Sequence, residues 1–126
     1  MAIGAELTQA LRTFAAQERE IVGLGQKVDP ENAMDFVRMR RRLVMGFADL
    51  NVALDKDPWL SSKPELLFEG RQHFSAFRAA NSINQANWPV IKARDDPRAY
   101  EVAARLVADK SRAFWNWIEK ELGVTR

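Results

Sequence analysis

Five polar residues interrupt the apolar stripes of this otherwise helical sequence, and together they have the chemistry to hold a small anion. They are Gln17, Arg40, Asn81, Asn84 and Lys110, called the polar layer below. Two cations can clamp a carboxylate or phosphate, and side-chain amides can donate further hydrogen bonds to it. Counting residues from the expected turns places Gln17, Arg40, Asn81 and Lys110 within about one helical turn of one another, with Asn84 level with them or just beyond. One interpretation is therefore a polar pocket at mid-bundle for an anionic ligand, with Arg40 and Lys110 as clamps.

A second interpretation of the polar layer needs no ligand. Arg40 and Lys110 would lay their aliphatic stems along the seam between helices and keep their charged heads in water. Asn81 and Asn84 would hydrogen-bond between helices and fix their register, as polar residues do in coiled coils. The pocket hypothesis fails if both cations face solvent with no cavity between them.

Residues for catalysis or metal binding are scarce. The chain of 126 residues has no cysteine and one histidine, His73, so thiol chemistry is excluded and a zinc or di-iron site is not expected. There is no nucleophile with an adjacent base, no glycine-rich phosphate loop and no Glu-x-x-His pair. His73 lacks the lysine and glycine that follow the histidine of phosphotransfer domains. We therefore expect that the protein is not an enzyme and that it binds no cofactor and no metal.

Apolar residues recur every three or four positions, which indicates helix throughout. The spacing predicts a first helix over about residues 4–27. A second begins at 29-DPEN-32, with Asp29 as its cap, and ends at Asp57-Pro58. A third begins at 62-SKPE-65, where Ser62 and Glu65 would form a capping box.

The third helix is expected to run through 81-NSINQANWPV-90 to Ile91, kinked at Pro89. A fourth begins at Asp96-Pro97 and stops at Gly123. No segment has the alternation or turns of strands. Four helices with short connections predict an all-α fold, a single-domain antiparallel up-down-up-down four-helix bundle over residues 1–126.

The stretch 114-FWNWIEKEL-122 has more apolar surface than one buried stripe accommodates. Trp115 and Trp117 lie about 160° apart around the helix, so one of them is expected to be exposed or at an edge. Exposed tryptophans anchor protein interfaces. The predicted partner-binding residues are therefore Trp88, Phe114, Trp115, Trp117 and Ile118, with core packing as the alternative.

Charge and hydropathy limit the partners. The net charge is only +2, which does not indicate nucleic-acid binding. The N-terminal residues lack the pattern of a signal peptide, and the longest apolar run, 43-LVMGFA-48, is too short to cross a bilayer. We expect a cytoplasmic protein with no membrane insertion. The basic run 38-RMRRR-42 is either a solvated helix face or a docking surface for an acidic partner.

The segment 83-INQANWPVIKAR-94 resembles the signature near the end of the third long helix in FlgN-type flagellar export chaperones. Asn84 and Asn87 fill the two asparagine places of that signature, and Ile83, Val90 and Ile91 fill its aliphatic places. The segment 36-FVRMRRRLVMGFADL-50 is similar to the family's basic residue before a leucine-rich stripe. The resemblance implies a non-enzymatic chaperone in bacterial flagellum assembly. Its protein client would be the C-terminal amphipathic helix of a hook–filament junction protein, held before type III export.

Two other functions remain open on the residues alone. One is a signalling or regulatory bundle that binds a partner protein or a small anion at the polar layer. The other is a homodimer formed through the aromatic C-terminal helix.

Overall fold

The computed structural model describes residues 2–126, which contain helices and no strand. Four helices are long: α1 (Ala5–Gly25), α2 (Ala33–Lys56), α4 (Pro64–Asn87) and α6 (Pro97–Trp117). Three are short: α3 (Pro58–Ser61), α5 (Val90–Asp95) and the π-helix η1 (Ile118–Leu122), which continues α6. The prediction of an all-α chain with four long helices is confirmed.

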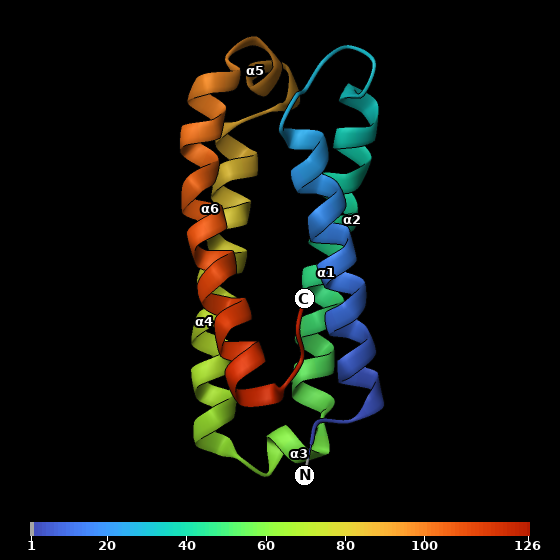
Figure 1. The fold of residues 1–126 in the computed structure, drawn as a ribbon, viewed down its shortest axis with the longest axis vertical. Helices are drawn as coiled ribbons and strands as arrows, with labels where there is room; N and C mark the ends of the chain where they lie inside the picture. The colour runs from blue at the N-terminus through green and yellow to red at the C-terminus, as the bar shows by residue number, and fades with distance from the viewer. Residues whose placement is uncertain (1) are drawn as a thin grey trace.

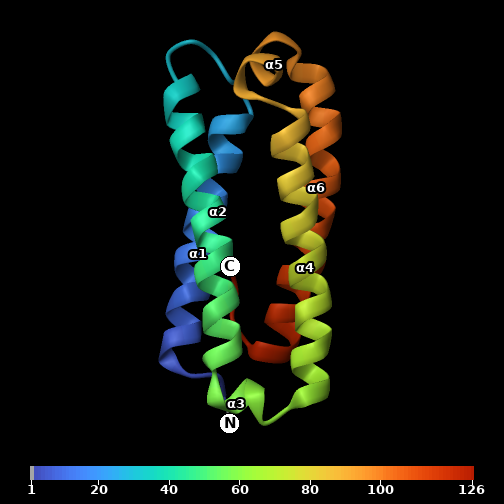
Figure 2. The ribbon, with the colours of Figure 1, turned by 180° about the vertical axis from the view of Figure 1, so that it is seen from behind.

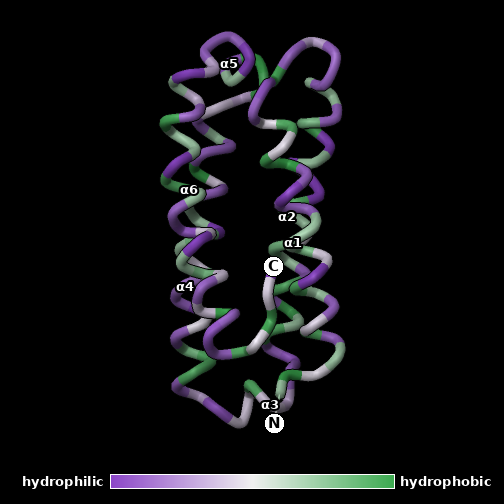
Figure 3. Tube along the Cα trace, in the orientation of Figure 1, coloured by the Kyte–Doolittle hydropathy of each residue, from purple (hydrophilic) through white to green (hydrophobic). Residues whose placement is uncertain are grey.

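The long helices lie lengthwise beside one another, as Figures 1 and 2 show from opposite sides. α1 packs mainly on α2, and α4 packs mainly on α6. The short helix α3 lies at one end of the molecule and α5 at the other (Figure 1). Hydrophobic and hydrophilic positions alternate along each long helix in Figure 3, as expected for helices that bury one face.

Two Asp-Pro pairs start helices by the same device. Asp57 accepts a hydrogen bond from the backbone N–H of Leu60 at 2.9 Å, and Pro58 takes the first position of α3. Asp96 accepts from the N–H of Ala99 at 3.3 Å at the start of α6. A carboxylate satisfies an N–H that a helix start leaves free, and proline has no N–H to lose. Asp57 also ends α2, as predicted.

Two other predicted helix starts are wrong. Asp29 does not start α2, because residues 30–32 form a separate turn in which its Oδ1 accepts from the backbone N–H groups of Glu31 and Asn32. The helix begins four residues later, at Ala33. Ser62 and Glu65 form no capping box: the residue before α4 is Lys63, and the Ser62 hydroxyl bonds to the carbonyl of Trp59 instead.

Pro89 ends a helix instead of kinking one. α4 stops at Asn87, and Trp88 has φ −126° and ψ 70°, outside the helical region. This agrees with the steric restriction that proline places on the preceding residue. The chain resumes in α5, and Ile91 is exposed there instead of continuing the buried face of α4.

Closely packed phenylalanines, in edge-to-face and tilted pairs, join the two helix pairs. Phe14 of α1 lies 4.8 Å from Phe47 of α2, ring centre to ring centre, and Phe47 lies 4.9 Å from Phe77 of α4. Phe77 in turn lies 5.8 Å from Phe114 of α6. All four are at most 1 % exposed. Such pairs add to the stabilisation from apolar burial, so this phenylalanine cluster holds the centre of the molecule.

A smaller core closes the end near α5, where Val28, Phe36 and Ala93 are buried together. Across residues 2–126, no helix is long and apolar enough to cross a membrane.

Candidate anion-binding cavity

A cavity of about 670 Å³ lies between the phenylalanine cluster and the smaller core. Side chains from all four long helices line it. Its polar lining includes Glu18, Arg40, Asn81, Asn84, Gln85, Arg98, Tyr100 and Glu101. Its apolar lining includes Ile21, Val22, Leu43, Phe77, Ala104, Val107 and Ala108. The volume falls in the range of small-molecule sites, which are mostly apolar with a few placed polar groups.

Arg40 is the buried cation of this cavity. It is 8 % exposed, and no carboxylate oxygen in residues 2–126 lies within 4.0 Å of its nitrogens. Its Nη1 donates to the carbonyl of Trp88 at 2.6 Å, whereas its Nη2 is buried with no partner. The guanidinium lies 4.6 Å from the centre of the Phe36 ring and 5.9 Å from that of Tyr100. These contacts offset its desolvation only in part.

Three amide side chains of α4 lie on the same wall of the cavity. Asn81 is 5 % exposed and its Nδ2 has no hydrogen-bond partner. Asn84 and Gln85 follow three and four residues later, which puts them on the same helix face. The Oδ1 of Asn84 and the Nε2 of Gln85 are also buried without partners. Buried polar atoms are nearly always paired, so this wall has unused hydrogen-bonding capacity.

The carboxylate of Glu18 has hydrogen-bond partners on both of its oxygens, unlike the guanidinium of Arg40, which has an unpaired nitrogen. It is 8 % exposed and accepts from Ser111 Oγ, from Trp115 Nε1 at 2.8 Å and from Arg126 Nη1 at 3.2 Å. The left-handed Gly123, with φ 72°, turns the chain after η1, and Arg126 then lies against α1 and α6. Glu18 therefore forms a closed network at the cavity wall, and its charge is compensated by Arg126.

The polar layer is brought together only in part. Arg40, Asn81 and Asn84 line one cavity, as the spacing predicted. Gln17 and Lys110 do not line it. Gln17 lies over Gly46 of α2, and Lys110 is exposed to solvent.

The two misplaced residues each have a neighbour that faces inward: Glu18 beside Gln17, and Ser111 beside Lys110. Gln17 and Lys110 were each chosen three positions after an inward-facing residue, whereas the residue four positions after it faces inward; both spacings occur in an apolar helical stripe. The spacing 7, 11, 14, 18 in α1 would have indicated Glu18, and Gln85 would follow from Asn81 by one turn.

The expectation that Trp115 or Trp117 is exposed is wrong. Trp115 is 4 % and Trp117 is 5 % exposed, and Phe114 and Ile118 are fully buried. Trp115 packs toward α1, with its ring centre 6.4 Å from that of Phe14, while Trp117 packs on Gly70 of α4. α6 buries a wide face because it has neighbours on two sides. A binding role for these residues stays a prediction, and it now requires that this end of the molecule opens.

Trp88 is half-buried, with its ring centre 5.7 Å from that of Tyr100 and with Lys92 Nζ 4.6 Å from its ring centre. It therefore belongs to the α5 end of the molecule, apart from the other four predicted partner-binding residues.

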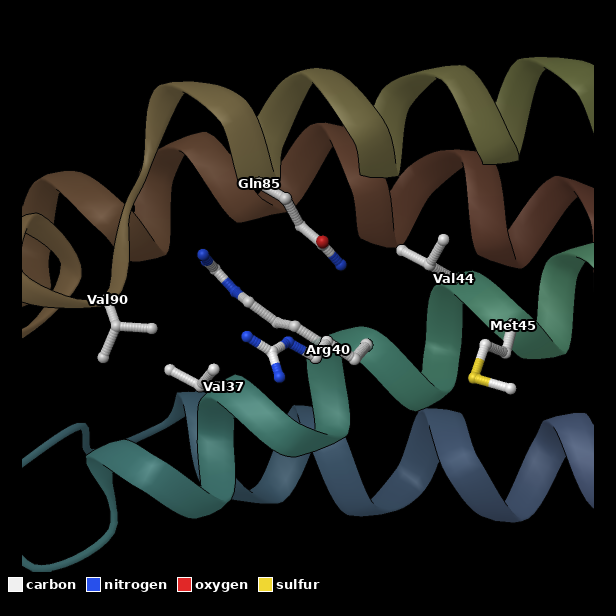
Figure 4. Close-up of a pocket in the computed structure, with 7 residues that line it drawn as sticks. Val37, Arg40, Val44, Met45, Gln85 and Val90 are labelled. Carbon is white, nitrogen blue, oxygen red and sulfur yellow. The ribbon is translucent and has the colours of Figure 1, made fainter.

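A shallow surface groove lies on the other side of Arg40, between α2, α4 and α5. Val37, Arg41, Val44, Met45 and Val90 line it, together with Arg40 and Gln85, which also line the cavity. Figure 4 shows Gln85 extending from α4 toward α2, where Arg40 begins. Val44 is 47 % and Met45 is 66 % exposed. The groove therefore presents apolar surface with a basic residue beside it.

The chain matches no protein-family model, no curated protein and no solved structure. In the part of the chain that the structure describes, no three His, Asp or Glu side chains are grouped to hold a metal ion. The function of the chain is therefore inferred from the geometry of the cavity and the groove.

Proposed function

We propose that this chain is a non-enzymatic regulatory helical bundle that binds a small organic anion in the cavity beside Arg40. The observation that carries the proposal is a buried guanidinium with no carboxylate near it and one nitrogen unpaired. An uncompensated buried charge destabilises a protein unless a partner is supplied. A guanidinium binds carboxylates in a bidentate manner, so an anionic ligand is the partner that its chemistry favours.

We also infer an antiparallel up-down-up-down topology for the four long helices. Short connections support it: residues 26–32 join α1 to α2, and residues 88–96 with α5 join α4 to α6. Short connections between long, packed helices favour antiparallel neighbours. The cavity would then be a site in the core of a bundle, where ligand sites of such folds are built.

The proposed function is tested by titrating the protein with two probe anions, butyrate and inorganic phosphate. Binding is followed by the chemical shifts of the amide and arginine side-chain groups in NMR spectra. We expect saturable shifts at the side chains of Arg40 and Asn81 in the wild type. Arg41→Met, a change of the exposed neighbouring arginine, is the matched control and should keep these shifts. Arg40→Met should lose them at Asn81. The proposal is wrong if neither anion gives a saturable shift, or if Arg40→Met responds as the wild type does.

A second candidate function is that of a cytoplasmic flagellar export chaperone, and the surface groove favours it. An amphipathic client helix could lay apolar side chains on Val44 and Met45, with an acidic residue beside Arg41. The resemblance at Asn84 and Asn87 supports the same function.

This second candidate is tested with fluorescent synthetic peptides that correspond to the C-terminal helices of hook–filament junction proteins. Met45→Glu should abolish binding, whereas Met34→Glu, at a residue equally exposed but outside the groove, should keep it. Absence of binding to the wild type overturns this function.

A further inference from the structure

We infer that the ligand of the cavity is a monocarboxylate with an apolar chain, and not a phosphate ester or another polyanion. This inference rests on the proposed anion-binding function and specifies its ligand class. It follows from three properties of the cavity: where its polar atoms lie, what covers its other walls and how its charges balance.

The groups that can hold an anionic head are concentrated at one wall. Arg40 of α2 and Asn81 of α4 are each more than nine-tenths buried, and each has a nitrogen without a partner. Gln85, one turn beyond Asn81, adds a third unpaired nitrogen. These three nitrogens are donors, which suit a carboxylate because it accepts several hydrogen bonds through its two oxygens. The unpaired Oδ1 of Asn84 on the same wall is an acceptor and does not hold the anion.

The remaining walls suit a hydrocarbon. Leu43, Phe77 and Val107 line the side next to the phenylalanine cluster, and Ala104 and Ala108 leave space along α6. A volume of about 670 Å³ exceeds what a bare two-oxygen anion fills. Since apolar surface is stabilised by apolar contact, the occupant should carry a chain beyond its carboxylate.

The charges of the lining favour a ligand with one negative charge over a ligand with several. The lining contains two cations, Arg40 and Arg98, and two carboxylates, Glu18 and Glu101, so its formal charges cancel. Arg98 and Glu101 are exposed and three residues apart on α6, where they offset each other. Glu18 already has Arg126 as its partner. Arg40 is then the one buried cation that requires a counter-charge, and a polyanion would bring further charges close to two carboxylates.

The inference is tested by calorimetric titration of the full chain with acetate, butyrate, hexanoate and octanoate. 1-Octanol serves as the uncharged match for octanoate, and pyrophosphate serves as the polyanion. We expect affinity to rise about fourfold per added methylene, which corresponds to burial of about 0.8 kcal/mol per CH₂. Octanol and pyrophosphate should bind more weakly than octanoate by about tenfold or more.

Four variants locate the apolar chain and the anionic head of the ligand. Ala104→Leu fills the apolar side of the cavity, so octanoate should lose affinity while butyrate keeps it. Ala108→Leu repeats this test at a second position, and circular dichroism checks that both variants are folded. Arg40→Met should reduce octanoate affinity to that of octanol, whereas Arg41→Met should leave it unchanged.

The outcomes separate this inference from the function on which it rests. If butyrate and octanoate bind equally, or pyrophosphate binds best, and Arg40→Met abolishes the binding, anion binding stands and the inference is overturned. If octanoate binds Arg40→Met as it binds the wild type, or no anion binds, both are overturned.

Discussion

The indole ring of Trp117 lies against Gly70 at a point where α4 has no room for a side chain. A Cβ on Gly70 would lie 2.8 Å from Cζ3 and 2.9 Å from Cζ2 of that ring, closer than real contacts allow. Because Gly70 of α4 has no side chain, the ring of Trp117 of α6 fits against the backbone of α4. This space on α4 lets α6 bury Trp117 as well as Trp115, where the helical spacing indicated that one of the two would be exposed or at an edge.

Gly70→Ala should lower the free energy of unfolding by about 1–3 kcal/mol, because overpacking forces the ring of Trp117 to move. Gly23→Ala is the matched control, since a Cβ at Gly23 has nothing within 4 Å and lies inside α1. That change should raise the same free energy by about 0.5–1 kcal/mol through helix propensity. Urea unfolding measures both, and a neutral Gly70→Ala would contradict the packing described for Trp117.

Glu18→Ala should cost about 2–4 kcal/mol of stability. It leaves Ser111 Oγ and Trp115 Nε1 buried without their acceptor, and unmade buried hydrogen bonds cost about 1–3 kcal/mol each. Glu20→Ala, an exposed position two residues along α1, should stay within about 0.5 kcal/mol of the wild type. Equal effects of the two changes in thermal unfolding would show that the network contributes nothing.

Asp57→Ala should destabilise the protein more than Asp96→Ala, although both residues cap a helix. Asp57 is 4 % exposed and its carboxylate also accepts from the N–H of Gly4 at 2.6 Å, so its loss leaves two donors unsatisfied. We expect about 2–3 kcal/mol for Asp57→Ala and about 0.5–1 kcal/mol for the exposed Asp96. Chemical unfolding of the two variants in parallel gives the comparison, and a reversed order would contradict the second contact of Asp57.

Without ligand, Arg40→Met should leave the free energy of unfolding unchanged or raise it by up to about 2 kcal/mol. A buried cation without a carboxylate is replaced by an apolar side chain of similar length, and such exchanges are often neutral or stabilising. Arg71 is the control, because it bonds to Asn51 Oδ1 at 2.7 Å and pairs with Asp55. Arg71→Met should therefore lower the free energy of unfolding by about 1 kcal/mol. A loss above about 2 kcal/mol for Arg40→Met would indicate that Arg40 is fully compensated without any ligand.

The fold was predictable to the level of four long helices because their apolar periodicity is strong. Asp96-Pro97 was interpreted correctly as a helix start, since a carboxylate before proline has a local mechanism. Asp57-Pro58 was interpreted correctly as the end of the second helix, whereas its start of α3 was not predicted. The sequence around Asp29 has the same letters, and its carboxylate accepts from the N–H three residues on, as in the other two pairs. Here, however, the side chain of Asn32 accepts from the N–H of Asp29 and donates to the carbonyl of Lys27, which closes a turn before the helix. Pro89 was misjudged because Trp88 and Ile91 kept the heptad phase, whereas the steric effect of proline on Trp88 ended the helix.

The cavity was predictable at Arg40, Asn81 and Asn84, where polar residues lie on an apolar seam. Gln17 and Lys110 were displaced by one residue, since steps of three and of four both fit an apolar stripe and the pattern alone does not choose between them. The partnership of Glu18 with Arg126 had no local signal, because it joins residues 108 apart through the turn at Gly123.

Each helix pair, α1 with α2 and α4 with α6, is closed by a short connection, and this has a consequence for the order of assembly. Closing a short loop costs little chain entropy, so both pairs are within reach early, from local encounters alone. The phenylalanine cluster requires both pairs to be present before its rings can meet across the molecule. We therefore expect formation of the two hairpins to precede their docking, with Phe47 and Phe77 at the contact that makes the process cooperative.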